Sequence, residues 1–523
     1  MPGSRPLRSL LVFAITVACL SCITSRGVGV SPLAATAADS VTVRSPVKAH
    51  LLDASTVVFT GGATVIRDTV HGAGWRWDLL LAESTAVARI PLDSVLAMES
   101  FATEVSSGRT LVYSTLATAA ALGGAVALIC VADPKCFGSC PTIYADSAGT
   151  PVLEAEGFSG SISPLLEARD VDRLRTRADS LGIVRLEVWN EALETHFINH
   201  LELLAAEHGA DEVVLPDQRG RPLAVAAELM LGSVTDRSGR DLRAVLARSD
   251  GDVFSSDTVT IAAATASDLL DHIDIALVRP AGADSVAVVL RLRSSLLNTL
   301  VFYDYMLARP GARSLDWMAE ELTRLDRVAE LGRWYGEHFG VRVSVHDGTG
   351  WLPVAKYSDY GPIAWRDVGL MVPVPTGDSV RIRLSFLTDQ WRIDRLAVAG
   401  RVRRVTPTPF QAASVTASDG TLQDDALAAL RAPDDHYLKT TPRQRFAVTF
   451  DVGRAPAGGT RRTFLLASQG YYIEWVRGTW MSGTRDTATF VPSAETLVRA
   501  LRDWESQRDS MERQFFRSRI PVL

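Results

Sequence analysis

His196, His200 and His208 are the residues whose types and spacing first suggest chemistry, because two histidines four residues apart on one helix face can chelate zinc. The surrounding run alternates apolar and polar residues at Leu201-Glu202-Leu203, which indicates a strand. Four strand residues separate the first two side chains by about 13 Å, too far for one metal ion. We therefore predict partly exposed strand histidines, with no metal and no cofactor.

Gly157-Phe158-Ser159-Gly160-Ser161 comes close to the nucleophile elbow of serine hydrolases. Its last residue is serine where the elbow has glycine, and the sequence around it shows no strand-to-helix pattern. No acid and base side chains are paired at a credible catalytic spacing. We therefore predict no catalytic residue and no enzyme. The alternative, a glycan-active enzyme, requires two carboxylates about 5 to 10 Å apart in an aromatic-lined cleft.

Cys136 and Cys140 form a close pair just beyond a long apolar segment. In an exported protein such a pair favours a disulfide across its three-residue loop, although spacing alone does not establish the bond geometry. A metal site would need two further ligands, and none is near in the sequence. We predict a Cys136–Cys140 disulfide.

The N-terminus has the order of an export signal, with Arg5 and Arg8 before an apolar run that ends at Leu20. Cys22 follows Cys19-Leu20-Ser21, which is similar to a lipoprotein cleavage box but has cysteine where that box usually has leucine. Residues 1–22 are therefore predicted as a signal, of the ordinary cleaved type or of the lipoprotein type with Cys22 as the lipid attachment site. Acyl chains there would tether the protein to a membrane, with residues 23–41 as linker.

A second apolar segment, residues 110–132, would rise about 33 Å as a helix, enough to cross a bilayer core. Arg109 and Lys135 flank it on opposite sides, so the positive-inside rule does not orient it. A true transmembrane helix would leave residues 136–523 in the cytoplasm, where cysteines stay reduced. Because the cysteine pair favours oxidation, we predict a membrane-associated helix with the large region exported.

The 523 residues carry 54 basic and 60 acidic side chains, a formal net charge of −6 with no basic block. That balance predicts no nucleic-acid partner. With 47% hydrophobic residues the chain is long enough for several domains with real cores.

Short period-two runs predict a mainly β protein. Residues 42–106 carry six such runs, and their order resembles an SH3-like or Sm-like small barrel. Trp75 and Trp77 lie two residues apart on one strand and are predicted to pack in the barrel core or at its mouth. The run Val259 to Ala263 is also predicted as a strand.

The remaining domains are read from where strand patterns give way to amphipathic helices. We predict a β-sandwich domain over 136–310, a connecting helix over 314–340, a jelly-roll-like β domain over 341–400, a C-terminal β domain over 401–492 and a C-terminal helix over 493–518.

The jelly-roll-like region is rich in aromatic residues, and its closing strands are similar to those of galactose-binding-like jelly rolls. In such domains rings on loops stack on sugars, whereas buried aromatics are the ordinary outcome. Exposed rings would favour glycan binding, and a wholly buried set would favour a protein partner or a structural role. The candidate ligand-binding residues are Trp351, Tyr357, Tyr360, Trp365 and Trp391.

Two groups of short motifs carry a family resemblance over about residues 130 to 480. The first group comprises Cys140-Pro-Thr-Ile-Tyr144, Glu156-Gly-Phe158, Val184–Asn190 and Glu194–Leu203. It resembles uncharacterised bacterial envelope proteins with a Cys-Pro-Phe-x-Tyr motif. This chain has Thr142 where that motif has phenylalanine. The second group comprises Asp435-His-Tyr437, Thr460–Leu466 and Gly470–Trp475. It resembles the C-terminal region of cartilage-acidic-protein-like bacterial proteins of the ASPIC/UnbV type. The β-propeller repeats that such proteins often carry are lacking in this sequence. The resemblance implies an exported, β-rich, non-enzymatic interaction protein.

From these features we expect an exported, membrane-anchored binding or scaffold protein of the bacterial cell envelope, periplasmic or surface-exposed. Its expected partners are the membrane and either an envelope glycan or another envelope protein. The alternative is an envelope carbohydrate-binding protein or glycan-active enzyme.

Overall fold

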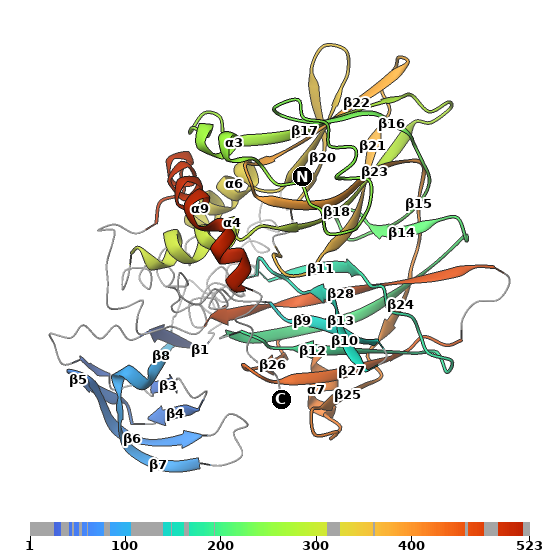
Figure 1. The fold of residues 1–523 in the computed structure, drawn as a ribbon. Helices are drawn as coiled ribbons and strands as arrows, with labels where there is room; N and C mark the ends of the chain where they lie inside the picture. The colour runs from blue at the N-terminus through green and yellow to red at the C-terminus, as the bar shows by residue number, and fades with distance from the viewer. Residues whose placement is uncertain are drawn as a thin grey trace, which may run out of the picture.

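The computed structural model describes residues 26–32, 41–43, 47–51, 55–59, 61–77, 84–105, 140–147, 149–161, 167–192, 194–310, 325–358, 361–454, 459–474 and 490–515. Within these ranges the protein is mainly β, with its strands in five sheets (Figure 1). The export signal, the apolar segment 110–132, Cys22, Cys136 and Tyr360 lie outside them. None of the helices in the described ranges is long and apolar enough to cross a bilayer.

The N-terminal sheet has eight strands in the order β1-β8-β3-β4-β6-β5-β2, with β7 paired to β6. Alternate residues such as Val57 and Phe59 are buried in its core, as the period-two pattern predicted. The strands are β1 (Arg26–Pro32), β2 (Val41–Val43), β3 (Val47–Leu51), β4 (Thr56–Phe59), β5 (Ala63–Ile66), β6 (Thr69–Trp77), β7 (Ser84–Pro91) and β8 (Val95–Val105), with a 3-10 turn, η1 (Leu92–Ser94), before the last.

Two details of this sheet differ from the predictions. Residues 26–32, predicted as linker, form β1 and pair antiparallel with β8. Trp75 is 51% exposed and not in the core, because it lies on the face of β6 opposite buried Val70.

A first pair of sheets follows, and its two inner faces share one core that includes Leu186 and Val448 on one side and Leu203 and Leu466 on the other. One sheet has the order β10-β9-β12-β27-β25, and the other has β11-β28-β13-β24 with β26 paired to β13. Its elements are β9 (Thr142–Ser147), β10 (Thr150–Glu156), β11 (Ala168–Arg173), β12 (Ile183–Trp189), β13 (Glu194–His208), β24 (Thr408–Gln411), β25 (Ser414–Ala417), α7 (Asp424–Ala429), β26 (Leu438–Thr440), β27 (Arg445–Asp451) and β28 (Arg461–Glu474).

A second pair of sheets encloses another core, with Val288 and Leu370 on one side and Ile275 and Ile382 on the other. The sheets have the orders β14-β15-β23-β18-β21 and β16-β17-β22-β19-β20. Their strands are β14 (Val213–Pro216), β15 (Pro222–Glu228), β16 (Leu231–Asp236), β17 (Leu270–Val278), β18 (Ser285–Ser294), β19 (Val341–His346), β20 (Trp351–Tyr357), β21 (Arg366–Pro373), β22 (Ser379–Leu387) and β23 (Trp391–Arg404).

The two pairs stack as four layers, with the β16-β17-β22-β19-β20 sheet outermost (Figure 1). Leu204 and Leu465 of the first pair pack against Val214 and Ala224 of the second, so an apolar layer also joins the pairs. Apolar residues therefore fill the space between each two adjacent sheets, and one face of the outermost sheet is left without a neighbouring sheet.

The sheets do not follow the domain boundaries that we read from the sequence. The chain leaves the first pair after β13, builds the whole second pair from β14 to β23, and returns at β24. Strands from 136–310 and 341–400 therefore share sheets, and strands from 401–492 complete the first pair. Strand patterns are local, whereas strand partners are chosen by long-range packing, so the pattern alone did not show this insertion.

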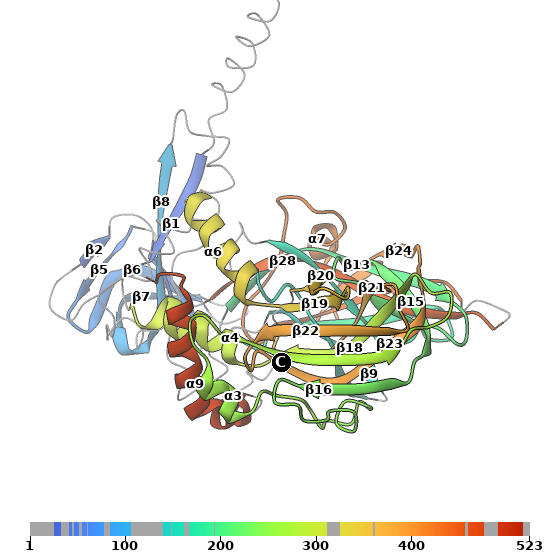
Figure 2. The same ribbon diagram turned by 90° about the horizontal axis from the view of Figure 1, so that it is seen from above.

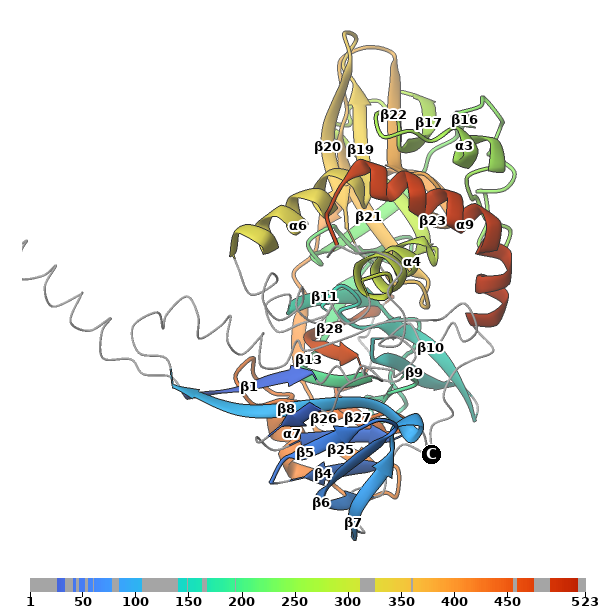
Figure 3. The same cartoon turned by 90° about the vertical axis from the view of Figure 1, so that its left-hand side faces the viewer.

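Helices gather at one end of the sheets around an apolar core that includes Trp334, Phe490, Leu497 and Trp504 (Figure 3). They are α3 (Thr258–Ala263), α4 (Leu297–Leu300), a π-helical turn η4 (Val301–Ala308), α6 (Leu325–His338) and α9 (Ala494–Phe515). The last two agree with the helices predicted over 314–340 and 493–518, as far as the described residues reach.

One predicted strand is a helix. The run Val259 to Ala263 forms α3, because the Asp257 side chain caps it by accepting a hydrogen bond from the Thr260 N–H at 2.7 Å. The capping carboxylate accepts a hydrogen bond from a backbone N–H that, in a strand, would be donated to a carbonyl of the neighbouring strand. This local contact outweighs the β-branched composition of the run.

Candidate functional site

The sequence motifs of the resemblance meet in one buried cluster of the first sheet pair, which we call the motif cluster and which consists of Cys140, Tyr144, Glu156, Glu191, Glu194 and His196. Strands β9, β10, β12 and β13 position these side chains. Each is less than a tenth exposed. The cluster is therefore closed to solvent, and a substrate would have no direct approach to it.

Cys140 is a buried free thiol. Burial raises the pKa of the Cys140 thiol well above its ordinary value, and the nearby carboxylates of Glu156 and Glu194 raise it further. A protonated, buried thiol is unreactive. Cys136 lies outside the described residues, so the disulfide stays a prediction.

Glu191 holds the motif residues of β9 in place. It accepts hydrogen bonds from the Thr142 hydroxyl and from the Tyr144 hydroxyl, both at 2.8 Å. The Tyr144 ring stacks on Trp189 with 4.1 Å between ring centroids. Thr142 thus uses its hydroxyl at the position where the resembled motif has phenylalanine.

His196 and Glu194 form a buried pair on β13, with 2.6 Å between His196 Nε2 and Glu194 Oε1. The other ring nitrogen, Nδ1, lies 3.0 Å from Thr440 Oγ1. His200 and His208 are also buried, so the prediction of a strand is confirmed and the prediction of partly exposed histidines is wrong. The reason is that apolar cores lie against both faces of β13, with Leu203 in one and Leu204 in the other.

Glu156 joins the two sheet pairs. Its Oε2 accepts the backbone N–H groups of Ile363 and Ala364 at 2.8 and 3.0 Å, in the segment before β21. Arg366 donates to the Glu156 carbonyl and to Asp172, the latter at 2.7 Å. A Cβ on Gly361 would lie only 2.8 Å from Glu156 Oε2, so this close approach needs glycine.

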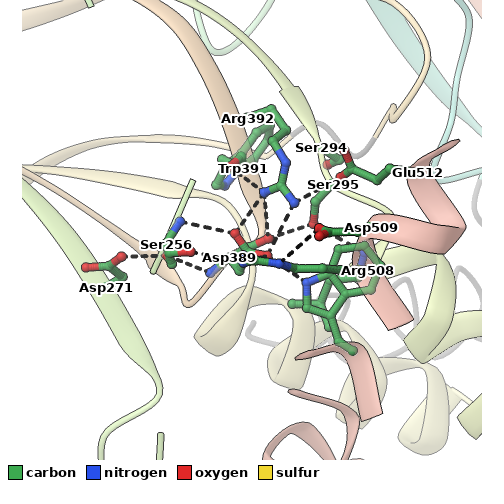
Figure 4. A network of polar contacts seen from close by, with 12 residues as sticks. Ser256, Asp271, Ser294, Ser295, Asp389, Trp391, Arg392, Arg508, Asp509 and Glu512 are labelled. Atoms are coloured by element: carbon green, nitrogen blue, oxygen red, sulfur yellow. Dashed lines mark hydrogen bonds and ion pairs between the residues drawn. The ribbon is translucent and has the colours of Figure 1, made fainter. Parts of the chain in front are cut away.

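A second buried cluster, the Asp389 cluster, attaches the C-terminal helix to the second sheet pair (Figure 4). Asp389 is fully buried and accepts hydrogen bonds from Ser256 N at 3.1 Å, Trp504 Nε1 at 2.7 Å and Arg392 NH1 at 2.8 Å. Arg392 also pairs with Glu512 of α9 at 2.9 Å. Asp389 thereby connects three parts of the chain, namely the loop before α3, strand β23 and helix α9.

Sequence reasoning missed the Asp389 cluster. Asp389 sits in the turn between β22 and β23 with a positive φ of 55°, a conformation that aspartate tolerates better than most residues. The available signal was a polar Thr388-Asp389-Gln390 turn between two apolar strands. That signal predicts the turn, but nothing in it points to Trp504, which lies 115 residues further along.

The predicted aromatic residues do not form one platform in the described part of the chain. Trp391 and Tyr357 are buried in the core of the second pair, with 6.0 Å between ring centroids. Trp365 is half-buried beneath the guanidinium groups of Arg291 and Arg293. Trp351 lies on β20, at the edge of the outermost sheet, and is half-buried.

Trp351 belongs to the outward side of the outermost sheet, which faces away from the other layers. Figure 2 looks down on this layer, and the helices lie beside it. Apolar residues of β19 and β22 such as Val343 and Ile382 point inward to the core, so alternate residues point outward. We call this surface the outer face and define it by Asp274, Arg342, Trp351, Lys356, Arg381 and Arg383.

The described residues contain no group of three or more His, Cys, Asp or Glu side chains arranged to hold a metal ion. The two buried clusters are instead closed by hydrogen bonds to neighbouring strands and to helix α9. The outer face is where side chains of the described region converge at an exposed surface.

Comparison with known proteins identifies no family: no family model and no curated protein matches the chain. Among solved structures, a GH31 α-xylosidase from Xanthomonas citri is similar at 11% identity, with 83% of this chain and 38% of the xylosidase chain covered and a TM-score of 0.14. This chain therefore spans well under half the length of that protein.

Two further solved structures are comparably distant. An exo-β-1,3-galactanase from Phanerochaete chrysosporium is 10% identical, covers 70% of this chain and 84% of its own, and has a TM-score of 0.14. The tandem CBM22 domains from Paenibacillus barcinonensis are 8% identical, cover 72% and 77%, and have a TM-score of 0.11. Likenesses of this size carry no argument about the activity of this chain.

Proposed function

We propose that this chain is an exported, membrane-anchored binding or scaffold protein of the cell envelope that presents the outer face to its partner and performs no catalysis. The observation that carries the proposal is the outer face itself, an exposed surface with one half-buried tryptophan, three arginines and one lysine. It belongs to the second sheet pair, which Glu156 joins to the first pair and to which the Asp389 cluster attaches helix α9.

The finer architecture belongs to the same proposal. We infer that each sheet pair is a β-sandwich of jelly-roll type, because each has two five-stranded antiparallel sheets around a shared apolar core. The N-terminal sheet would be the small SH3-like or Sm-like barrel. In this arrangement Cys22 or the segment 110–132 supplies the membrane anchor.

The alternative, a glycan-active enzyme, is less well supported than binding. Glycoside hydrolysis uses two carboxylates on either side of the scissile bond. Of the six residues that define the outer face, one is acidic, Asp274. Arg383 donates a hydrogen bond of 2.7 Å to each of its two carboxylate oxygens. That geometry favours a fixed binding surface.

The side of the membrane is tested with an engineered reporter cysteine. Met230, in the turn between β15 and β16, is 92% exposed, so a Met230→Cys variant of the full-length protein should react with a membrane-impermeant maleimide in intact spheroplasts. The unsubstituted protein is the control for labelling of the natural cysteines. Labelling that appears only after lysis would overturn the proposed export.

Binding is tested with envelope material from the host cells. The full-length protein should co-sediment with the envelope fraction after its own anchor has been solubilised in mild detergent. The single variants Trp351→Ala and Arg381→Gln should each bind more weakly. Arg185→Gln is the matched control, because Arg185 is an exposed strand arginine on β12 in the other sheet pair. Equal binding by all three variants would show that the outer face is not the site.

A further inference from the structure

The outer face is a regular array, because the strand register places its side chains in rows across the sheet. Ser344 of β19 is opposite Arg383 of β22, and Arg383 is opposite Asp274 of β17. In the next row Lys356 of β20 is opposite Arg342. Three strand spacings separate β20 from β17, so the array is about 14 Å wide.

Positive charge is concentrated on this surface. Arg342, Lys356, Arg381 and Arg383 lie here with the carboxylate of Asp274, and Glu337 of α6 also acts on Arg342, whereas the whole chain has a net charge of −6. Burial lowers the pKa of Lys356, and the charge of Arg342 lowers it further. Lys356 and Arg342 therefore repel each other, and both donate to the Gly336 carbonyl of α6, at 2.7 and 3.3 Å. An anion bound beside this pair would relieve the repulsion.

The tryptophan is held in a fixed orientation beside these cations. The Arg383 guanidinium carbon lies 4.4 Å from the centroid of the Trp351 ring, and that of Arg381 lies 5.4 Å from it. Asp274 fixes Arg383 by two hydrogen bonds of 2.7 Å. Arg381 is exposed beside this assembly and has guanidinium N–H groups that can bind a carboxylate in two places at once.

Two histidines complete the surroundings. The His346 ring meets Trp351 edge to face at 5.2 Å. Burial lowers the pKa of His272, and the charge of Arg383 lowers it further, so His272 is neutral at pH 7 and offers hydrogen bonds without a charge. Half-buried Ser385 adds a hydroxyl group between the cations, whereas Ser344 is only 8% exposed.

We propose that the outer face binds an acidic polysaccharide, a glycan chain whose sugar rings carry carboxylate groups. The aromatic ring suits the C–H face of a sugar, the arginines suit its carboxylates, and Ser385 and the histidines suit its hydroxyls. A row of such groups about 14 Å wide fits an extended chain better than one small ion. This inference rests on the proposed binding function and names its ligand class.

The experiment is affinity electrophoresis of the full-length protein in gels that contain polygalacturonate, with dextran gels as the neutral control. We expect retardation by polygalacturonate and none by dextran. Arg381→Gln and Trp351→Ala should each weaken binding about tenfold, because each removes one charged hydrogen-bonding group or one ring. Arg381→Lys should recover part of the loss, and Arg185→Gln should bind as the unsubstituted protein does.

Three results would overturn the inference. Equal retardation by dextran would show that the acidic groups are not recognised. Stronger binding to vesicles of phosphatidylglycerol than to polygalacturonate would assign the cations to a lipid surface. Loss of polygalacturonate binding in Arg185→Gln would show non-specific attraction. If envelope binding persists and depends on Trp351 while polygalacturonate fails, only the ligand class is wrong and the proposed function stands.

Discussion

At the residue scale, a single carboxylate can decide whether distant parts of this chain stay together. Asp389 accepts hydrogen bonds from a loop before α3, from strand β23 and from helix α9. All three donors are buried, and without it Ser256 N and Trp504 Nε1 would lose this acceptor, whereas Arg392 would keep its pairing with Glu512. Because an unpaired buried donor costs free energy, the stability of the helix end of the molecule depends on this residue.

Asp389→Ala should lower the free energy of unfolding by about 3 kcal/mol, since it removes the acceptor of buried Trp504 Nε1, removes one of the two carboxylates that pair with buried Arg392, and places alanine at a positive φ. Urea denaturation followed by tryptophan fluorescence measures this. Asp389→Asn should lose less, because asparagine tolerates the same backbone conformation.

The control for this prediction is Asp241→Asn, where an exposed carboxylate pairs with Arg243 and is surrounded by water. It should change stability much less than Asp389→Ala. Equal effects of the two substitutions would contradict a structural role for the Asp389 cluster.

His200 should make stability depend on pH. Burial lowers the pKa of His200 below its ordinary 6.5, Arg169 lowers it further, and Glu202 partly opposes the shift. The folded state therefore binds fewer protons than the unfolded state in the range below pH 6.5. The stability that this neutral histidine contributes is present above pH 6.5 and is lost as pH falls through that value toward the folded pKa.

The free energy of unfolding should consequently decrease between about pH 7.5 and 5.5, and His200→Gln should reduce that decrease. The shift of His272 is in the same direction, so part of the slope should remain. The same substitution at exposed His436 is the control. A slope that His200→Gln leaves unchanged would refute this assignment.

At the element scale, the glycines show which backbone segments are under constraint. In helix α6, Gly332 is exposed, and a Cβ added there would meet nothing within 4 Å. At Gly470 on β28, by contrast, a Cβ would collide with the Phe197 carbonyl and lie 2.9 Å from the ring of Phe158. The close contact at Gly470 sits beside the register shift of β13 at Ile198 and His200.

Alanine should therefore have opposite effects at these two positions. Gly332→Ala should raise the free energy of unfolding by about 0.5 to 1 kcal/mol, because alanine favours the helix and its methyl group would clash with no neighbouring atom. Gly470→Ala should lower the melting temperature, because the β13–β28 pairing must shift to make room. Differential scanning calorimetry measures both, and a stabilised Gly470→Ala would show that the strand contact is looser than the structure indicates.

At the scale of the whole molecule, the two sheet pairs are one unit because charged groups cross between them. Arg366 of the second pair and Asp172 of the first are each about 5% exposed and lie 2.7 Å apart. Asp367 likewise accepts from Arg173 across the same boundary at 3.2 Å. These contacts supplement the apolar layer around Leu204 and Val214.

Arg366→Met should cost about 3 kcal/mol, because it removes the buried guanidinium that pairs with the Asp172 carboxylate and donates to the Glu156 carbonyl. We expect calorimetry to show one unfolding transition for the unsubstituted protein and two for this variant, as the pairs uncouple. The double variant Asp172→Asn with Arg366→Met should recover much of the stability. A single transition in every variant would mean that the apolar layer alone couples the pairs.

Sequence by itself determined the local features of this protein. The alternation of apolar residues predicted strands such as β18 and β22, and the amphipathic run after Ser493 predicted α9, because burial on one side imposes a period that is visible within ten residues. It also marked Trp351 as a candidate ligand-binding residue. It failed at α3, where one capping carboxylate outweighed strand composition.

Only the tertiary structure decided which of these elements meet. The insertion of the second sheet pair into the first, the contact of Glu156 with Ile363, and the contact of Asp389 with Trp504 each join residues more than a hundred positions apart. The outer face was likewise decided by tertiary packing, because Trp351 and Asp274 come from separate strands of one sheet. Periodicity records that a side chain is buried, but its partners are fixed by the packing of whole sheets, and that information is not local.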